Sequence, residues 1–264
     1  MLDMINVLGP VGFIVISLVT FLFGITIGSF LNVCIYRIPL DEDIAVERSH
    51  CMKCGHILKW YELVPLFSWI IQGGKCRSCK QKISIQYPIV EAGNAILWLM
   101  VLYTNGLTWQ TLIYFFCSSC MIVISVIDER THEINIFLNI FIAVLGVVNL
   151  VLDYKNWIYY VIGMLCVSVV LLIIVIVSKE RAMGLGDVYL MAASGLLLGW
   201  KHTICAFVLA CVLGSIIHLI RMAASKKKDH VLALGPYLCL GIYFTMLFGN
   251  YIIDWYSNFL HFDF

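Results

Sequence analysis

Residues 11–36 read VGFIVISLVTFLFGITIGSFLNVCIY, and no residue between Met4 and Tyr36 carries a charge. An apolar stretch of about 18 residues or more is long enough to cross the hydrocarbon core of a bilayer. A backbone in lipid must satisfy its own hydrogen bonds, which favours an α-helix for such a segment. The stretch therefore predicts a membrane-spanning helix.

The composition extends this prediction to the whole chain. Hydrophobic residues make up 62% of the 264 residues and charged residues only 12%, whereas about a quarter of a soluble domain is charged. This excludes an ordinary water-soluble fold, and we expect an all-α, polytopic bundle of about eight transmembrane helices. The apolar runs are 11–36, 88–104, 109–127, 134–152, 157–178, 187–200, 202–220 and 234–253.

The Lys and Arg residues indicate the orientation of these helices. The connections 37–87, 128–133, 179–187 and 221–230 together hold 15 of the 17 Lys and Arg residues. Basic residues gather on the cytoplasmic side of membrane proteins, so we expect these connections there and both termini outside. The basic run 226–228 is expected to orient the chain through anionic lipid. The expected partner is the lipid bilayer, with no nucleic acid.

The one polar segment of any size, 37–87, contains two Cys-x-x-Cys pairs, Cys51 with Cys54 and Cys76 with Cys79. Two such turns supply the four sulfurs of a tetrahedral zinc site. Free or disulfide-bonded cysteines are the alternative, although a cytoplasmic location opposes stable disulfides. Four sulfurs leave no open coordination position, so we predict structural zinc that orders this loop.

These features predict three segments in the chain. They are a first transmembrane segment at 1–36, a cytoplasmic four-cysteine loop at 37–87, and a seven-helix membrane domain at 88–264.

Two aspartates lie at ends of apolar runs on the predicted cytoplasmic side. Asp128 follows the third run, and Asp187 precedes the sixth. Singly, each could be a boundary residue, and Asp187 could cap a helix. Together, neighbouring carboxylates share one proton, so that one can activate water while the other donates to a scissile carbonyl. Gly184 and Gly186 are expected to adopt backbone conformations barred to other residues and to let a substrate strand approach.

Several short motifs follow one another along the chain. They are Gly28-Ser29-Phe30-Leu31-Asn32-Val33, the two cysteine pairs, Pro65-Leu66-Phe67-Ser68-Trp69, Gly74-Lys75-Cys76-Arg77, Tyr87-Pro88-Ile89-Val90-Glu91, Gly184-Leu185-Gly186-Asp187 and Gly235-Pro236-Tyr237. In this order they resemble the motifs of the type IV prepilin peptidases, a family of membrane aspartyl proteases with a Gly-x-Gly-Asp signature. Together these motifs span almost the whole chain, and their shared order indicates the family more specifically than any single motif does.

The resemblance implies an aspartic-type endopeptidase that removes a basic leader peptide from prepilins or pseudopilins, for type IV pilus assembly or protein secretion. It implies a multi-pass protein of the bacterial cytoplasmic (inner) membrane with its active site facing the cytoplasm. Asp128 and Asp187 would be the catalytic pair. Members of the family usually also methylate the new N-terminus with S-adenosylmethionine, so this cofactor is expected beside zinc.

A further set of residues is a candidate for the substrate or methyl-donor site. Its members are Gly28, Ser29, Asn32, Glu91, Gly184 and Gly186. For Gly28, Ser29 and Asn32, a small-residue contact between helices is an equally good interpretation.

The chain departs from the family at Ile134-Asn135, where an Ile-Pro pair is typical. Proline suits the first position of a helix, so this departure puts the local geometry at the start of the next helix in question.

Two other functions are compatible with part of the sequence. The first is a membrane transporter with a zinc-ordered cytoplasmic loop, in which the acids bind a cation. Inverted repeats would then be expected, and none is visible. The second is a methyltransferase without proteolysis. The sequence indicates neither the particular prepilin nor the oligomeric state.

Overall fold

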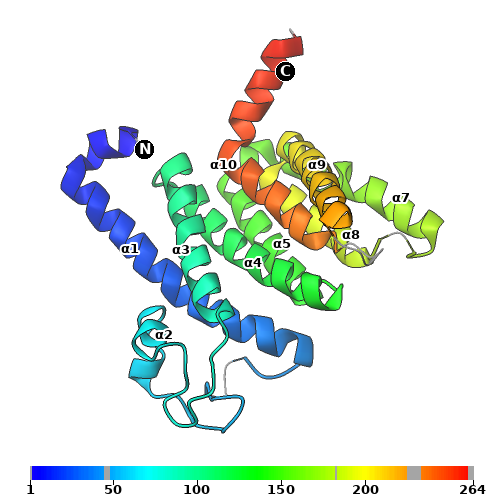
Figure 1. Cartoon of the computed structure of the whole chain (residues 1–264). Coiled ribbons are helices and arrows are strands. Elements are labelled where there is room, and N and C mark those ends of the chain that lie inside the picture. Colours follow the sequence, from blue (N-terminus) through cyan, green and yellow to red (C-terminus); the bar gives the residue numbers. More distant parts are fainter. Residues whose placement is uncertain (1, 45–47, 182, 225–232, 261–264) are drawn as a thin grey trace. The chain divides into compact units, whose positions relative to one another are not determined.

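The computed structural model describes residues 2–44, 48–181, 183–224 and 233–260 (Figure 1). Within these residues, the regular structure is helical, apart from two isolated β-bridges. The α-helices are α1 (Leu2–Arg37), α2 (Phe67–Ile71), α3 (Gln86–Asn105), α4 (Trp109–Thr131), α5 (Ile136–Leu152), α6 (Trp157–Cys166), α7 (Ser168–Ser178), α8 (Leu185–Leu198), α9 (Trp200–Ala224) and α10 (Gly235–Leu260). Three short 3₁₀ helices join them: η1 (Ile38–Leu40), η2 (Trp60–Glu62) and η3 (Tyr154–Asn156).

Every predicted apolar run lies within a helix to within two residues at its ends, except that the run 157–178 is divided between α6 and α7. In the described part of the chain, five segments are long and apolar enough to cross a membrane. They are Leu8–Leu40, Trp109–Thr131, Tyr154–Ser178, Trp200–Ile220 and Gly235–Phe259. The helices α5 and α8 are apolar but shorter. The expectation of an all-α, polytopic membrane protein is therefore confirmed. The basic run 226–228 lies outside the described residues.

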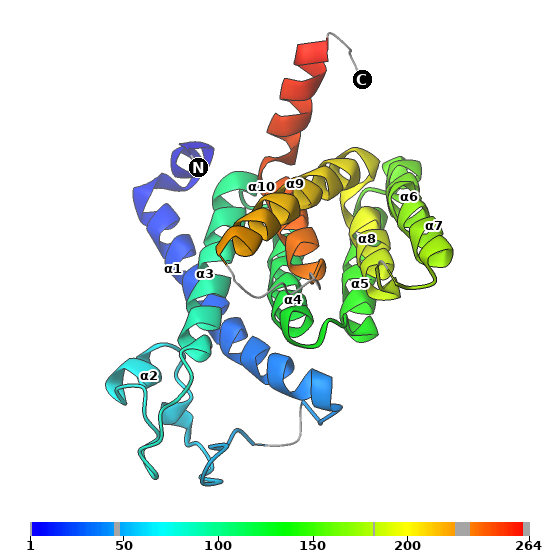
Figure 2. The ribbon, with the colours of Figure 1, turned by 45° about the vertical axis from the view of Figure 1, so that its right-hand side comes forward.

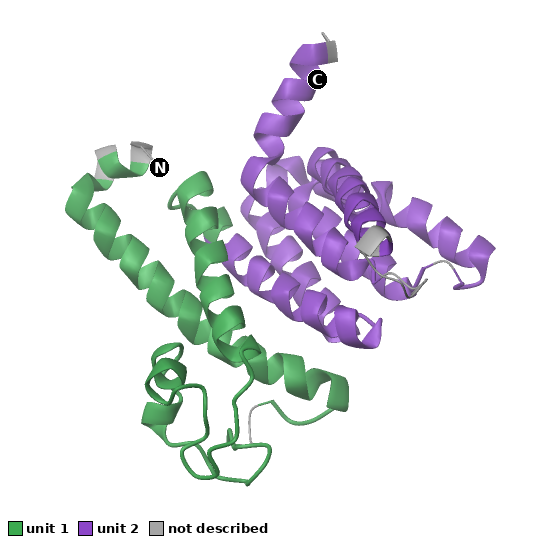
Figure 3. Ribbon diagram, in the orientation of Figure 1, with its two compact units in different colours: residues 1–111 green, residues 112–264 purple. Residues whose placement is uncertain are grey.

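The chain forms two compact units, Met1–Thr111 and Leu112–Phe264, so the boundary falls at the start of α4 (Figure 3). The first unit holds α1 to α3, and the second holds nearly all of α4 and α5 to α10. The predicted division at residues 36 and 87 is a finer one and stays a prediction.

In the first unit, α1 and α3 lie side by side in both views (Figures 1 and 2). Two glycines of α1 make this close packing possible. A Cβ added at Gly24 would lie 2.6 Å from the Cα of Ala95, and one at Gly28 would lie 2.7 Å from the Cα of Glu91. The amide of Asn94 also donates to the carbonyl oxygen of Gly24 at 2.8 Å. Small residues and one buried amide therefore hold these helices together.

In the second unit, α8 is the central helix and contacts α5, α6, α7, α9 and α10. Its closest neighbour is α6, because Gly195 and Gly163 face each other. A Cβ on either glycine would overlap the backbone of the other helix. Leu190, Met191 and Leu197 of α8 are fully buried. The helix that carries Asp187 is thus fixed on several sides.

Candidate active site and metal cluster

Asp128 lies near the C-terminal end of α4, and only 5% of its surface is exposed. Its Oδ2 accepts a hydrogen bond of 3.0 Å from the backbone N–H of Gly235, the first residue of α10. A Cβ at residue 235 would lie 2.6 Å from this oxygen. The glycine therefore allows the start of α10 to reach the carboxylate.

Asp187 lies in the first turn of α8 and is half-buried. It does not cap the helix, because Gly184 occupies the N-cap position. Asp128 and Asp187 are close enough for their charges to act directly on one another. Both also act on the buried thiol of Cys239 in α10. The structure thus brings together, within one unit, the two carboxylates that the sequence singled out.

The glycines before Asp187 serve a different purpose from the expected one. Neither Gly184 nor Gly186 has a positive φ, so the prediction of a backbone conformation barred to other residues was wrong. Gly186 is needed for space, because an added Cβ would lie 2.9 Å from the Cβ of Ile134. At Gly184, the nearest atom to an added Cβ is 3.9 Å away, which leaves this side of the loop open.

The start of α5 explains the departure from the family's Ile-Pro pair. Asn135 is the N-cap of α5, and its side-chain oxygen accepts a 2.9 Å hydrogen bond from the N–H of Phe137. A capping asparagine satisfies one of the free N–H groups of a helix start. One turn later, the buried Asn139 donates to the carbonyl oxygen of Gly186 at 3.3 Å. The α5 start is therefore well formed, and it supports the Gly-x-Gly-Asp loop.

Two residues near the aspartates carry only weak signals in the sequence: Asn139, and Gly235, which belongs to the Gly235-Pro236-Tyr237 motif. Asn139 follows Asn135 by one helical turn in a helix whose one other asparagine is Asn149. Polar residues at membrane depth are candidates for a functional role, and this spacing was the available signal. For Gly235, no local pattern indicates a contact with a residue 107 positions away.

The four predicted zinc ligands form a cluster in the first unit. The Sγ atoms of Cys51, Cys54, Cys76 and Cys79 all lie within 4.8 Å of one another. Cys51 and Cys79 are 3.9 Å apart, and Cys54 and Cys76 are 4.0 Å apart. Four sulfurs about 2.3 Å from a tetrahedral zinc ion lie about 3.8 Å from each other. The donor set therefore fits zinc closely, and none of the cysteines forms a disulfide.

The backbone of each cysteine turn favours thiolates, the form that binds metal. The N–H groups of Lys53 and Cys54 lower the pKa of Cys51 to about 7. The N–H groups of Cys79 and Ser78 likewise lower the pKa of Cys76. The N–H of Gln81 favours the Cys79 thiolate, but burial and the neighbouring sulfurs raise its pKa to about 11. Such a crowded set of sulfurs can all be ionised only beside a cation.

The cluster belongs to a segment, residues 48–85, that we call the cysteine region. The β-bridges His50–Ile57 and Lys75–Lys82 close its two turns. Glu62 is buried and accepts hydrogen bonds from the N–H of Lys59 at 2.9 Å and from His56 at 3.2 Å. Those contacts hold the pKa of Glu62 below its ordinary value.

The cysteine region is tied to α3 through Glu91. Its Oε2 accepts a 2.7 Å hydrogen bond from the N–H of Leu66, a residue with a positive φ of 61°. Asn32 of α1 donates to the carbonyl oxygens of Gly28 and Tyr87, while its own buried Oδ1 accepts no hydrogen bond from the described residues. Gly28 packs against Glu91, as described above. These candidates lie at one junction within the first unit.

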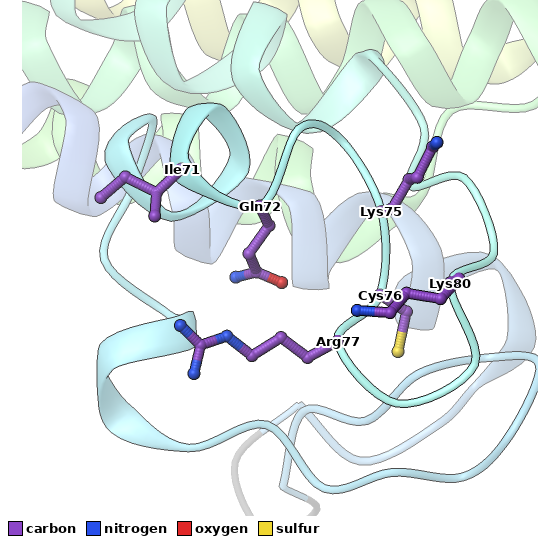
Figure 4. A pocket seen from close by; sticks show the side chains of 6 residues that line it. All are labelled: Ile71, Gln72, Lys75, Cys76, Arg77 and Lys80. Atoms are coloured by element: carbon purple, nitrogen blue, oxygen red, sulfur yellow. The ribbon is translucent and has the colours of Figure 1, made fainter.

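Among the described residues, an open cavity lies near the functional residues of each unit. Figure 4 shows the first, of about 250 Å³, lined by Ile71, Gln72, Lys75, Cys76, Arg77 and Lys80. The second, of about 280 Å³, is lined by Ser125, Val126, Glu129, Arg130 and Pro236. These residues flank Asp128 and Gly235 in the chain. The second cavity therefore lies beside the helix turns that carry the carboxylate and its hydrogen-bond donor.

The fold and site define a class: a helical membrane protein that has a carboxylate pair in one unit and a four-sulfur cluster in the other. Residues 22–105 match the bacterial Peptidase A24 N-terminal domain, and residues 115–219 match the type IV leader peptidase family. The chain belongs to the type IV leader peptidase family.

Curated relatives agree with this membership. One from Aeromonas salmonicida is 30% identical, over 90% of this chain and 92% of the relative. One from Pseudomonas aeruginosa is 27% identical, over 96% of each. One from Myxococcus xanthus is 30% identical, over 78% of this chain but 63% of the relative. All three are named prepilin leader peptidase/N-methyltransferase. No solved structure matches the chain. The family membership confirms the resemblance and favours a peptidase over a transporter.

Proposed function

We propose that this chain is a membrane aspartyl endopeptidase that removes the leader peptide from type IV prepilins or pseudopilins and N-methylates the new N-terminus. The family membership and the names of its relatives support this activity. The concentration of basic residues in a few connections supports a site that faces the cytoplasm from the bacterial inner membrane.

The observation that carries the proposal is the pairing of Asp128 with Asp187. One carboxylate takes a proton from a water molecule while the oxygen of that water attacks the scissile carbonyl carbon. The other, protonated, gives its proton to the carbonyl oxygen, which forms a neutral tetrahedral diol. In the second half of the reaction, the carboxyl group that took the water proton gives it to the leaving nitrogen as the C–N bond breaks. The other carboxylate then takes a hydroxyl proton from the diol. Both groups return to their starting state.

Zinc fits the four sulfurs and would be held by Cys51, Cys54, Cys76 and Cys79. A metal with four protein ligands has no open position for substrate, so it would supply structure rather than chemistry. Its effect would be to close the two turns onto each other and order the cysteine region.

The methyl donor is proposed at the junction of α1 and α3. The buried Oδ1 of Asn32, which lacks a donor among the described residues, is an acceptor left for a bound group. Ser29 and Glu91 lie at the same junction, with Gly28 allowing the close packing. S-adenosylmethionine would supply the methyl group for the new N-terminal amine. Gly184 and Gly186, in the other unit, are proposed to border the peptide at Asp187.

The test uses purified protein in detergent with candidate prepilins, and mass analysis of the mature N-termini. We expect Asp128→Asn and Asp187→Asn each to abolish cleavage while the protein stays inserted and folded. Glu133→Gln, which changes an exposed acid near Asp128, is the matched control and should cleave normally. Cleavage at the wild-type rate by the Asp187→Asn protein would contradict the proposal. Labelled methyl incorporation, measured separately on pre-cleaved pilin, tests the transferase activity.

A further inference from the structure

The start of α10 offers one N–H group to the dyad. Helices leave their first N–H groups without partners inside the helix. At this end, Pro236 has no N–H, and those of Tyr237 and Leu238 donate to the carbonyl oxygen of Leu234 at 3.0 and 3.1 Å. The N–H of Gly235 points instead to Oδ2 of Asp128, at 3.0 Å. This end of α10 therefore delivers a single donor to a single carboxylate.

The two aspartates differ in the hydrogen bonds that they accept. Among the described residues, Asp187 accepts no hydrogen bond, although it lies in the first turn of α8. The positive end of a helix stabilises a nearby carboxylate, and both aspartates have a helix start beside them. A direct hydrogen bond to a charged group contributes more than this dipole effect. The bond from Gly235 thus favours the ionised form of Asp128 over that of Asp187.

We infer that Gly235 is a positioning residue that keeps Asp128 as the ionised member of the pair and leaves the shared proton on Asp187. This assignment rests on the proposed function and deepens it. Asp128 then takes the proton from the attacking water, and Asp187 protonates the carbonyl oxygen. When the C–N bond breaks, Asp128 passes its proton to the leaving nitrogen and Asp187 recovers one from the diol.

The side chain at position 235 is restricted by the same contact. A Cβ would lie 2.6 Å from Oδ2 and 2.9 Å from Cγ of Asp128, closer than non-bonded atoms approach. Alanine would therefore displace the carboxylate from its donor. Another glycine of α10, Gly241, is also tightly packed, but against the backbone of Ala206 and Ala210 in α9. A substitution at Gly235 therefore tests the positioning of Asp128, whereas one at Gly241 tests the packing of the same helix.

The first test compares Gly235→Ala with Gly241→Ala in prepilin cleavage. We expect Gly235→Ala to lower kcat roughly 10- to 100-fold with KM unchanged, the loss that corresponds to one charged hydrogen bond. Gly241→Ala should instead lower the melting temperature, with no selective loss of kcat. A Gly235→Ala protein with the kcat of the wild type would overturn the inference.

A second variant covers the case in which Gly235→Ala does not fold. Replacing the amide between Leu234 and Gly235 with an ester exchanges the N–H for an oxygen and adds no side-chain atom near Asp128. We expect the same selective loss of kcat at an unchanged melting temperature. An unchanged kcat in the ester protein would equally refute the role of Gly235.

A labelling experiment reads the proton location without cleavage. An aryl glycidyl ether alkylates an ionised carboxylate, whereas a diazoacetyl amino acid ester with copper reacts with a protonated one. Peptide mapping should place the epoxide on Asp128 and the diazo reagent on Asp187. The reverse pattern would overturn the inference and leave the proposed function intact. A wild-type protein that shows the expected pattern but cleaves no prepilin would overturn the function instead.

Discussion

The cysteine region and the interior of the second unit are ordered by different means. In the cysteine region, turns, two isolated bridges and four sulfurs replace a core, and Trp60 and Ile71 are 80% and 77% exposed. Around α8, long helices pack so closely that glycines face each other. We propose that the first arrangement depends on a bound metal, whereas the second depends on steric fit. The same kind of substitution should therefore act differently in the two places.

The largest effect is expected from removing a zinc ligand. Structural zinc contributes roughly 10–16 kcal/mol of apparent binding free energy in small zinc-dependent peptides. Cys76→Ser should lose the bound zinc and open residues 48–85 to limited proteolysis, whereas Cys211→Ser, which lies outside the cluster, should keep both. Metal analysis by mass spectrometry and digestion patterns are the measurements. Full zinc content in the Cys76→Ser protein would show that the cluster does not bind the metal.

An intermediate effect is expected at the glycine contact between α6 and α8. Gly195→Leu would place a side chain where the backbone of Gly163 lies. Overpacking typically costs about 1–3 kcal/mol and sometimes more, and here backbone atoms must move. We expect a lower melting temperature and reduced prepilin cleavage, with the zinc content unchanged. If zinc were lost as well, the two regions would not be ordered independently.

The smallest effect is expected at the junction of the cysteine region with α3. Glu91→Ala removes the acceptor for the N–H of Leu66, and the loss is confined to one hydrogen bond. Hydrogen exchange at the Leu66 amide should accelerate, while the zinc content and the position of Asp187 should not change. Glu91→Gln keeps an acceptor oxygen, so its exchange rate at the Leu66 amide should lie between those of the wild-type and Glu91→Ala proteins. Unchanged exchange at Leu66 in the alanine protein would exclude this tether.

Local patterns were sufficient for the helices and singled out two aspartates that lie near each other, and they failed where distant segments meet. Uncharged runs predict helices because lipid imposes that conformation locally. Gly186 shows the limit of such patterns, because a glycine can be required either for an unusual backbone angle or for close packing. Only the position of Ile134 identifies close packing as the reason at this residue. The bond from Gly235 to Asp128 depends on how α4 and α10 pack, which no periodicity reveals.

The shortness of α5 and α8 has a consequence for the surrounding lipid. With 17 and 14 residues, these packed helices rise only about 26 and 21 Å, less than the roughly 30 Å of a typical hydrocarbon core. A bilayer accommodates such a mismatch by thinning locally, at a modest cost per Å. Acyl-chain length thus acts on the helices that carry Asp187 and its supporting Asn139, and lipid thickness becomes a physical variable of this site.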